Sequence, residues 1–201
     1  MQKSYLLVVF SLLVIAIFLV GFNARDNSIE YQPIIEKPAD SSEAYYTMMS
    51  VISHPRCVNC HPNNNVPKRG MEGTPHPFGR DGATSNLSFD VLLCASCHKE
   101  ENDDFAGQPG APHWNLAPKS MAWEGLSKAE IAASMLNPKN NGNRSHEDIM
   151  KHLTEDELVL WAFEPGLHPD GTPREKPPVS EETFVAAVKT WFANGAVIPE
   201  D

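Results

Sequence analysis

Cys57-Val58-Asn59-Cys60-His61 and Cys94-Ala95-Ser96-Cys97-His98 are the two stretches that decide how this chain folds. Each has the spacing C-x-x-C-H, which is the attachment motif for c-type haem. In this chemistry the two thiols add across the two vinyl groups of the haem, and the following His ligates the iron from one side. The two motifs use all four cysteines of the chain. The sequence therefore predicts two haem c groups, held by Cys57, Cys60, Cys94 and Cys97, with His61 and His98 as proximal iron ligands.

Other uses of two C-x-x-C pairs suit this sequence less well. A thioredoxin-like redox motif belongs to a βαβ pattern, and none is visible here. A structural zinc site would leave both neighbouring histidines without a role. Disulfides are compatible with an exported protein, but cysteines this close in sequence close too short a loop to stabilise a fold much. The haem interpretation is therefore preferred.

The composition also indicates an interior filled by a cofactor. Of 201 residues, 17 are Pro and 12 are Gly, and 41% are apolar. Residues 62–90 and 102–118 are rich in Asn, Pro and Gly and show little periodicity, so they need more than their own hydrophobic pattern to hold a shape. Two apolar macrocycles would supply the missing core. We expect a mainly α fold with long irregular loops.

The charge balance disfavours a nucleic-acid partner. The formal net charge is −10, from 26 acidic and 16 basic residues, whereas nucleic-acid-binding domains usually carry a basic stripe. An acidic soluble head suits basic protein partners better.

The N-terminal segment predicts export and a membrane anchor. Residues 6–22, after Lys3, are almost entirely apolar, and a helix of that length would be about 26 Å long, near the lower limit for spanning a bilayer. A signal-cleavage site after Ala24 would place Phe22 where a small residue belongs, so an uncleaved signal-anchor is favoured over a cleaved signal. Lys3 keeps the N-terminus in the cytoplasm.

This segment sets the expected domain organisation. Residues 1–22 are the transmembrane helix, residues 23–39 a flexible tether, and residues 40–201 the dihaem cytochrome c domain. In a bacterium the tether would hold that domain in the periplasm, at the inner membrane.

Helical patterns flank the irregular region. In residues 41–53, Asp40 and Glu43 form a capping box, and one face carries Tyr45, Met48, Met49 and Ile52, for which core packing is the preferred explanation.

Capping boxes also mark helix starts in the C-terminal half. They begin at Ser127 with Glu130 and at Thr154 with Glu157, and a last helix begins at Ser180 and ends at Gly195. That last helix has Phe184, Val188, Trp191 and Phe192 on one face. No strand is evident.

The sequence does not decide which residue would be the second axial ligand of each iron. A six-coordinate haem needs a distal His or Met, whereas a five-coordinate haem leaves a site free. His76 is the leading candidate, because Pro75 and Pro77 stiffen the segment that holds it between the two motifs. His54 precedes the first motif and could reach the neighbouring haem; its alternative role is a hydrogen-bonded histidine at a helix end.

Other candidates rank below these two. His152, on a predicted helix, and Met121 remain alternatives, and Met121 is equally explained as a core residue. His113 and Met71 rank lower still. His146 and His168 are expected to be solvated at the surface.

Further motifs accompany the two attachment sites and are fairly specific as a set. Residues 53–62, Arg80-Asp81-Gly82 and residues 109–118 resemble the dihaem c-type cytochrome family associated with isoquinoline 1-oxidoreductase. Residues 121–125, 137–144 and 158–166 match it too, so the likeness covers nearly the whole exported head. It implies a membrane-tethered periplasmic protein that passes single electrons from a molybdenum hydroxylase-type dehydrogenase toward the respiratory chain.

One position departs from that family, and a second likeness supports His76. A His commonly follows the Trp of the Pro-Gly-Ala-Pro segment, whereas Asn115 stands here and His113 precedes Trp114, which argues against a ligand role for this segment. The region between the motifs also resembles the small dihaem subunit of periplasmic nitrate reductase, in which a His before an Arg-Asp-Gly run is a distal ligand.

Two classes of function follow from these patterns. The first is an electron carrier that is not itself an enzyme and whose partners are redox proteins, a donor dehydrogenase and an acceptor. The second is a dihaem enzyme, such as a peroxidase with one open iron. No second catalytic constellation is visible in the sequence, so the carrier is preferred.

Overall fold

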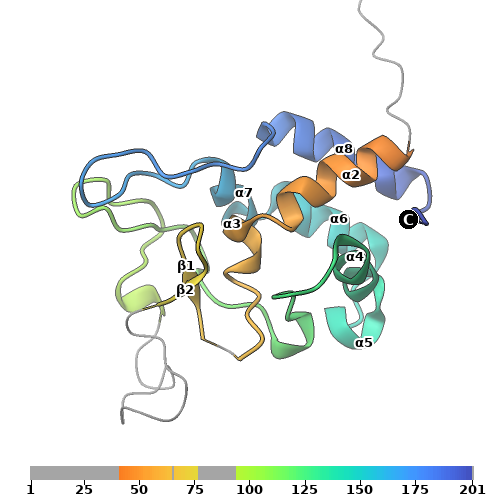
Figure 1. Cartoon of the computed structure of the whole chain (residues 1–201), viewed down its shortest axis with the longest axis horizontal. Helices are drawn as coiled ribbons and strands as arrows, with labels where there is room; N and C mark the ends of the chain where they lie inside the picture. Colours follow the sequence, from red (N-terminus) through yellow and green to blue (C-terminus); the bar gives the residue numbers. More distant parts are fainter. Residues whose placement is uncertain (1–40, 65, 77–93, 201) are drawn as a thin grey trace, which may run out of the picture. The chain divides into compact units, whose positions relative to one another are not determined.

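The structure is a computed structural model that describes residues 41–64, 66–76 and 94–200. These residues belong to one compact unit, Lys37–Asp201. They are mainly helical, as the sequence predicts, with long irregular connections (Figure 1). The expected membrane anchor and tether lie outside the described residues. Within the described part of the chain, none of the helices has the length and apolar character that crossing a bilayer requires.

Helices of one to four turns make up most of the regular structure. In chain order they are α2 (Ser41–Ile52), α3 (Pro55–Val58), α4 (Lys128–Leu136), α5 (Pro138–Asn141), α6 (His146–Glu155), α7 (Glu157–Leu160) and α8 (Glu181–Ala193). Short 3-10 turns cover Cys94–Ser96, Lys119–Met121 and Trp161–Phe163.

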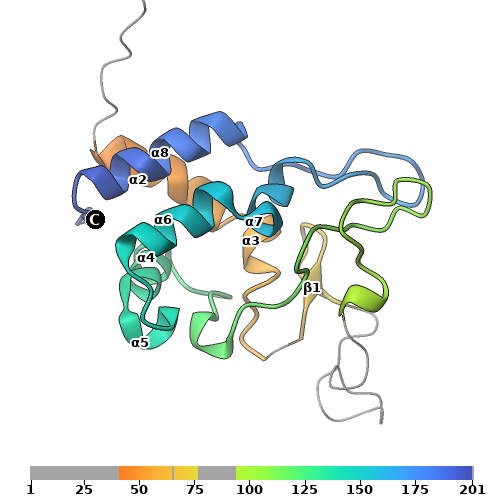
Figure 2. The ribbon, with the colours of Figure 1, turned by 180° about the vertical axis from the view of Figure 1, so that it is seen from behind.

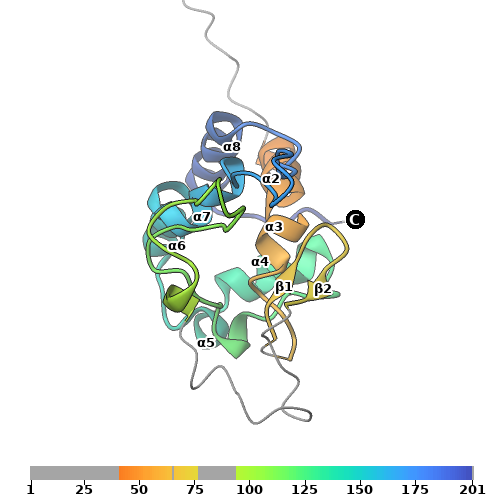
Figure 3. The same ribbon diagram turned by 90° about the vertical axis from the view of Figure 1, so that its left-hand side faces the viewer.

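A two-stranded hairpin follows the first C-x-x-C-H motif. Strand β1 (Lys68–Arg69) pairs antiparallel with β2 (Thr74–Pro75). The sequence predicted no strand, because two residues are too few to show an alternating pattern. Figures 1 and 3 both place the hairpin beside α3. Asn59 is the C-cap residue that follows α3. Its side chain donates a hydrogen bond of 2.8 Å to the carbonyl of Gly70.

The hydrophobic core lies where α2 and α8 pack side by side (Figures 1 and 2). The predicted face of α2 is confirmed, since Tyr45, Met48, Met49 and Ile52 are all buried. On α8, Phe184, Val188 and Trp191 are buried as expected, and Phe192 is half-buried. The indole nitrogen of Trp191 donates to the carbonyl of Val197 over 2.7 Å, so this buried polar group is satisfied.

Two predicted helix starts are confirmed. The hydroxyl of Ser127 accepts a hydrogen bond from the backbone of Glu130, whose carboxylate accepts one from the backbone of Ser127 in return. Ser180 caps α8 by accepting from the backbone of Thr183. Gly195, just after α8, has a φ of +86°, the left-handed conformation that ends many helices. The capping role of Asp40 lies outside the described residues.

The helix start predicted at Thr154 is wrong. Thr154 lies in the last turn of α6, which begins after Ser145. Its hydroxyl donates backwards to the carbonyl of Met150 over 2.9 Å, so it does not cap a following turn. Helix α7 begins instead after Asp156, whose carboxylate accepts from the backbone of Leu158.

Residues 99–110 and 164–175 form two irregular loops that lie side by side (Figures 1 and 2). The Asn102 side chain joins them by donating to the carbonyl of Glu164 over 2.9 Å. Arg174 donates to the carbonyl of Gly107 over 2.7 Å. Gly107 has no space for a side chain, because an added methyl group would collide with the backbone of Pro169. Hydrogen bonds and close backbone contact therefore replace a hydrophobic core here.

A matched pair of substitutions on α8 tests the assigned core. Val188 is fully buried and Val185, on the same helix, is only half-buried. Val188→Ala should lower the free energy of unfolding by about 2 kcal/mol, since it removes two buried methyl groups and leaves a cavity. Val185→Ala should cost less than half as much. Chemical denaturation of the two variants measures this, and equal costs would contradict the packing described for α8.

Candidate haem-binding sites

Two cavities in the described part of the chain each contain one C-x-x-C-H motif. Both cysteines and the histidine of the first motif line a cavity of about 490 Å³. The same three residues of the second motif line a cavity of about 740 Å³. Both volumes fall in the range that proteins use for small molecules and cofactors. In each motif, the two thiols and the imidazole therefore line the same cavity.

The walls of the two cavities differ in character. The first is lined largely by apolar side chains of the helical core, among them Ile52, Met135, Leu153 and Phe184. The second is lined mainly by loops, with the basic side chains Arg56, Lys68, Arg69 and Arg174 in its wall. Neither wall includes an Asp or a Glu among its described residues. Both cavities therefore suit a group that is apolar or negatively charged.

The histidine of the first motif is held in one orientation. His61 Nδ1 lies 2.6 Å from the carbonyl oxygen of Met121. A carbonyl can only accept, so Nδ1 carries the hydrogen and Nε2 keeps its lone pair. The imidazole also stacks on Trp123, with ring centroids 3.4 Å apart and planes 7° apart. The free nitrogen of His61 therefore has a fixed direction.

The second motif repeats this arrangement with a different supporting segment. His98 Nδ1 lies 2.7 Å from the carbonyl oxygen of Pro109, and the side-chain amide of Gln108 lies 3.1 Å from the same nitrogen. The ring stacks on Trp114, with centroids 4.3 Å apart and planes 7° apart. Metal-ligating histidines characteristically bond their other nitrogen to a carbonyl or carboxylate, which fixes the tautomer and orients the ring.

Burial favours the neutral form of both histidines, which is the form that a metal ligand must have. Burial lowers the pKa of His61 to about 4; the hydrogen bond to Met121 opposes this effect and the charge of His152 adds to it. Burial also lowers the pKa of His98, against the opposing hydrogen bond to Pro109.

The two cysteines of the first motif are buried, which shows in their acidity. All four cysteines are free thiols rather than disulfides. Burial raises the pKa of Cys57 to about 12 and that of Cys60 to about 11, with the nearby Cys94 adding to the shift of Cys60. Among the described residues, no three His, Cys, Asp or Glu side chains converge as a metal-binding group.

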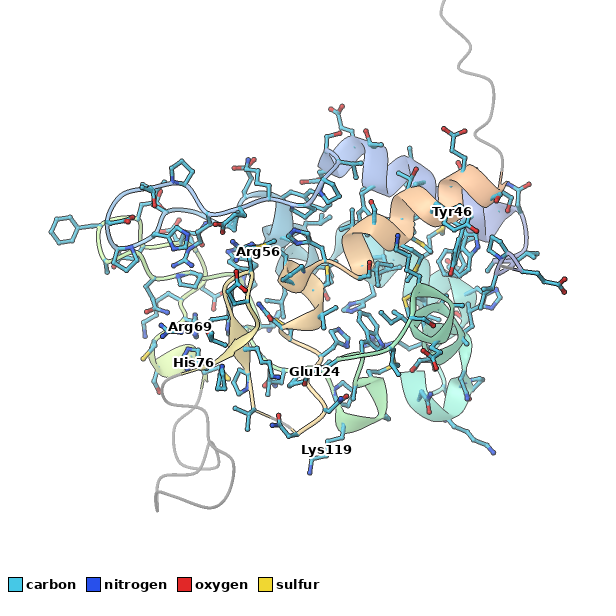
Figure 4. All side chains as sticks on the ribbon, in the orientation of Figure 1. Tyr46, Arg56, Arg69, His76, Lys119 and Glu124 are labelled. Carbon is cyan, nitrogen blue, oxygen red and sulfur yellow. The ribbon has the colours of Figure 1, made fainter. Side chains whose placement is uncertain are left out.

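His76 lies in the wall of the second cavity with His98. Figure 4 shows His76 at the hairpin, close to Arg69. The two ring centroids are 6.0 Å apart, with 59° between the ring planes. Two imidazoles on opposite sides of one metal ion, with bonds of about 2 Å, would have centroids about 6 Å apart. The backbone of His76 donates to the carbonyl of Pro67 over 2.8 Å, which fixes this end of the hairpin. Burial lowers the pKa of His76, and the neighbouring His98 and Arg69 lower it further.

His152 lies in the wall of the first cavity with His61. Its Nδ1 lies 2.9 Å from a carboxylate oxygen of Asp156, one turn later on the chain. A carboxylate accepts, so Nδ1 carries a hydrogen and the other ring nitrogen, Nε2, is not used in this bond. Met121 lines this cavity too, but its backbone carbonyl is the group that holds His61 Nδ1.

His54 is not brought to either cavity. It caps α3, where its Nδ1 accepts a hydrogen bond of 3.2 Å from the backbone of Arg56. The hydrogen must then sit on Nε2, so neither nitrogen has a lone pair to offer a metal. The structure therefore assigns His54 the alternative role, that of a hydrogen-bonded histidine at a helix end.

The remaining candidates are divided between surface and cavity. His113 is exposed and has a φ of +59°, Met71 is exposed, and His146 is exposed as predicted. His168, expected to be solvated, lies instead in the wall of the second cavity, 3.7 Å from the carboxylate of Glu175. No periodic pattern could have indicated this placement, because His168 lies in an irregular loop.

Five residues line both cavities and so form their common wall. This common wall consists of Arg56, Cys60, Asn115, Leu116 and Trp161. The indole of Trp161 donates to the Asn102 side chain over 2.9 Å and packs edge-on against Trp114, with centroids 4.7 Å apart. Sequence reasoning missed the roles of Arg56, Asn102 and Trp161. A possible signal for Arg56 was its place directly before Cys57.

Comparison with protein-family models, with curated proteins and with solved structures found no match to this chain.

Proposed function

We propose that this protein is a dihaem c-type cytochrome that transfers single electrons. One observation carries the proposal. Each of two cavities contains both thiols of a C-x-x-C-H motif together with a histidine whose Nδ1 is bonded to a backbone carbonyl. Covalent haem attachment needs the two thiols at this spacing, and iron ligation needs a neutral histidine with a fixed Nε2.

The residues present fit a haem. Cys57 and Cys60 would hold the first group and Cys94 and Cys97 the second, with His61 and His98 as proximal ligands. The apolar wall of the first cavity suits a macrocycle. The basic side chains in the second wall suit the carboxylate groups that haem carries.

When bound, each haem would supply an iron that takes up and releases one electron. The protein's part is to bind, orient and shield. The stacked rings of Trp123 and Trp114 and the carbonyls of Met121 and Pro109 keep each imidazole in place. A pre-set ligand geometry leaves little to rearrange when the charge of the site changes.

We assign the distal ligands as His76 for the second haem and His152 for the first. The 6.0 Å separation of the His76 and His98 rings supports the first assignment. His152 lies in the same cavity wall as His61 and is oriented through Nδ1 by Asp156, which supports the second. Two histidines on each iron would give lower potentials than His with Met, because Met ligation raises the potential.

The membrane tether and the partners complete the proposal. The apolar residues 6–22 would hold the haem domain at the outer face of a bacterial inner membrane. The resemblance described above favours a molybdenum hydroxylase-type dehydrogenase as the electron donor. The net charge of −10 favours redox partners with basic surfaces.

Paired cysteine variants test haem attachment. The holoprotein should contain two haem c groups per chain, measured as the pyridine haemochrome after acid–acetone extraction. Cys57→Ala with Cys60→Ala should remove one group, and Cys94→Ala with Cys97→Ala should remove the other. Each variant should also unfold at a lower temperature, because an apolar cavity loses its contents. A full haem complement in either double variant would refute the assigned attachment sites.

Alanine variants of the four histidines in question test the distal ligands. The oxidised wild-type protein should show two low-spin irons by electron paramagnetic resonance. His76→Ala and His152→Ala should each convert one iron to a partly high-spin state and leave the other unchanged. His54→Ala and His146→Ala serve as controls and should keep both low-spin signals.

Two results would contradict these assignments. Unchanged signals in His152→Ala would move the first distal ligand to Met121. A wild-type high-spin iron that binds cyanide would instead favour the dihaem enzyme, such as a peroxidase.

A further inference from the structure

Arg56 is a buried cation between the two cavities. The residue is 8% exposed, and its side chain lines both cavity walls. Arginines are almost never this buried unless they are paired. Arg56 is itself a residue of α3, directly before Cys57 of the first motif (Figure 4).

Glu175 is the ion-pair partner of this guanidinium. Arg56 Nε donates to the backbone carbonyl of Glu175 over 2.6 Å, and Nη2 donates to its carboxylate over 3.1 Å. The two partners differ in environment, since the side chain of Arg56 is 5% exposed and that of Glu175 is 52% exposed. Water screens the carboxylate far more than the guanidinium, so the pair leaves a net positive potential on the buried side.

The guanidinium is also fixed in position. It lies 5.8 Å from the ring centroid of Trp161, a residue of the common wall. Trp161 is in turn held by Asn102 and Trp114. A charge held this firmly acts on its surroundings as a constant field, because arginine stays protonated throughout the accessible pH range.

We propose that the positive charge of Arg56 raises the reduction potentials of both haems, so that it favours the reduced state of each. This inference rests on the proposed function. An oxidised haem carries one more positive charge than a reduced one. A nearby fixed cation therefore destabilises the oxidised form and raises the reduction potential, and a low-dielectric wall strengthens the effect. Because Arg56 lines both cavities, one side chain sets this field for both centres.

Arg174 provides a matched control. It is also a partly buried arginine, but it lines only the second cavity. It is held by hydrogen bonds to the carbonyls of Leu167 and Gly107. Removing its charge should therefore affect one haem, whereas removing that of Arg56 should affect two.

The test is a spectroscopic redox titration of the purified full-length holoprotein. In Arg56→Gln both potentials should fall, with a change of about tenfold in the ratio of reduced to oxidised haem, which is about 59 mV for a one-electron couple. Arg56→Lys should keep both potentials close to wild type. Arg174→Gln should lower the potential of the second haem only. The cysteines attach the haems covalently and the histidines ligate the irons, so two haems and two low-spin signals per chain should remain in all three variants even if a contact to a haem carboxylate is lost.

A second variant, which removes a negative charge and should shift the potentials in the opposite direction, keeps the test valid if Arg56→Gln does not fold. Glu175→Gln removes the compensating charge from an exposed side chain and leaves Arg56 in place. Both potentials should then rise, by less than they fall in Arg56→Gln, because water screens the carboxylate.

The outcomes separate this inference from the proposed function. A wild-type protein without two haems would refute the proposed function before any potential is measured. A dihaem protein in which Arg56→Gln and Glu175→Gln move neither potential, or only one, would overturn the role of Arg56 alone.

Discussion

Two hydrogen bonds from histidine to backbone carbonyl organise the rest of the structure. His61 Nδ1 binds the carbonyl of Met121, sixty residues later, and His98 Nδ1 binds that of Pro109, eleven residues later. Each bond brings an irregular segment over a C-x-x-C-H motif and places a tryptophan ring against the imidazole. In this way segments with little hydrophobic pattern of their own become the walls of defined cavities.

The domain consists of a small helical core and two cavities lined by the C-x-x-C-H motifs. The core between α2 and α8 is conventional, with Met48, Met49, Val188 and Trp191 buried. The two motif cavities, of about 490 and 740 Å³, have volumes in the range that proteins use for cofactors. A bound group that fills them would stabilise the native state by mass action or, when covalent, permanently. Folding and haem attachment are therefore expected to depend on each other.

How far the sequence predicted the structure depends on the range of the interactions. Local patterns gave the right answer for the buried face of α2, for the caps at Ser127 and Ser180 and for the end of α8, because these depend on residues three or four apart. The local signal at Thr154 failed because its hydroxyl bonds back within α6.

The common wall of the cavities was not predictable in this way. Arg56 is 119 residues from Glu175 and meets it only through the tertiary fold. The candidate site was predictable where covalent chemistry dictates a spacing, as in the two C-x-x-C-H motifs, and less so where it depends on loops. His76 was a candidate ligand because of its stiff proline segment, whereas its distance to His98 comes from a hairpin too short to show a pattern. His54 was a candidate by position, and its capping bond removes the lone pair that ligation needs.

Intact mass spectrometry of the full-length protein under denaturing conditions is the most direct test of the central claim. Covalent attachment survives denaturation, whereas a group held only by its iron ligands is released. The account predicts a single species whose mass exceeds that of the polypeptide by two haem groups. A mass equal to that of the bare polypeptide, or to the polypeptide with one haem, would contradict it.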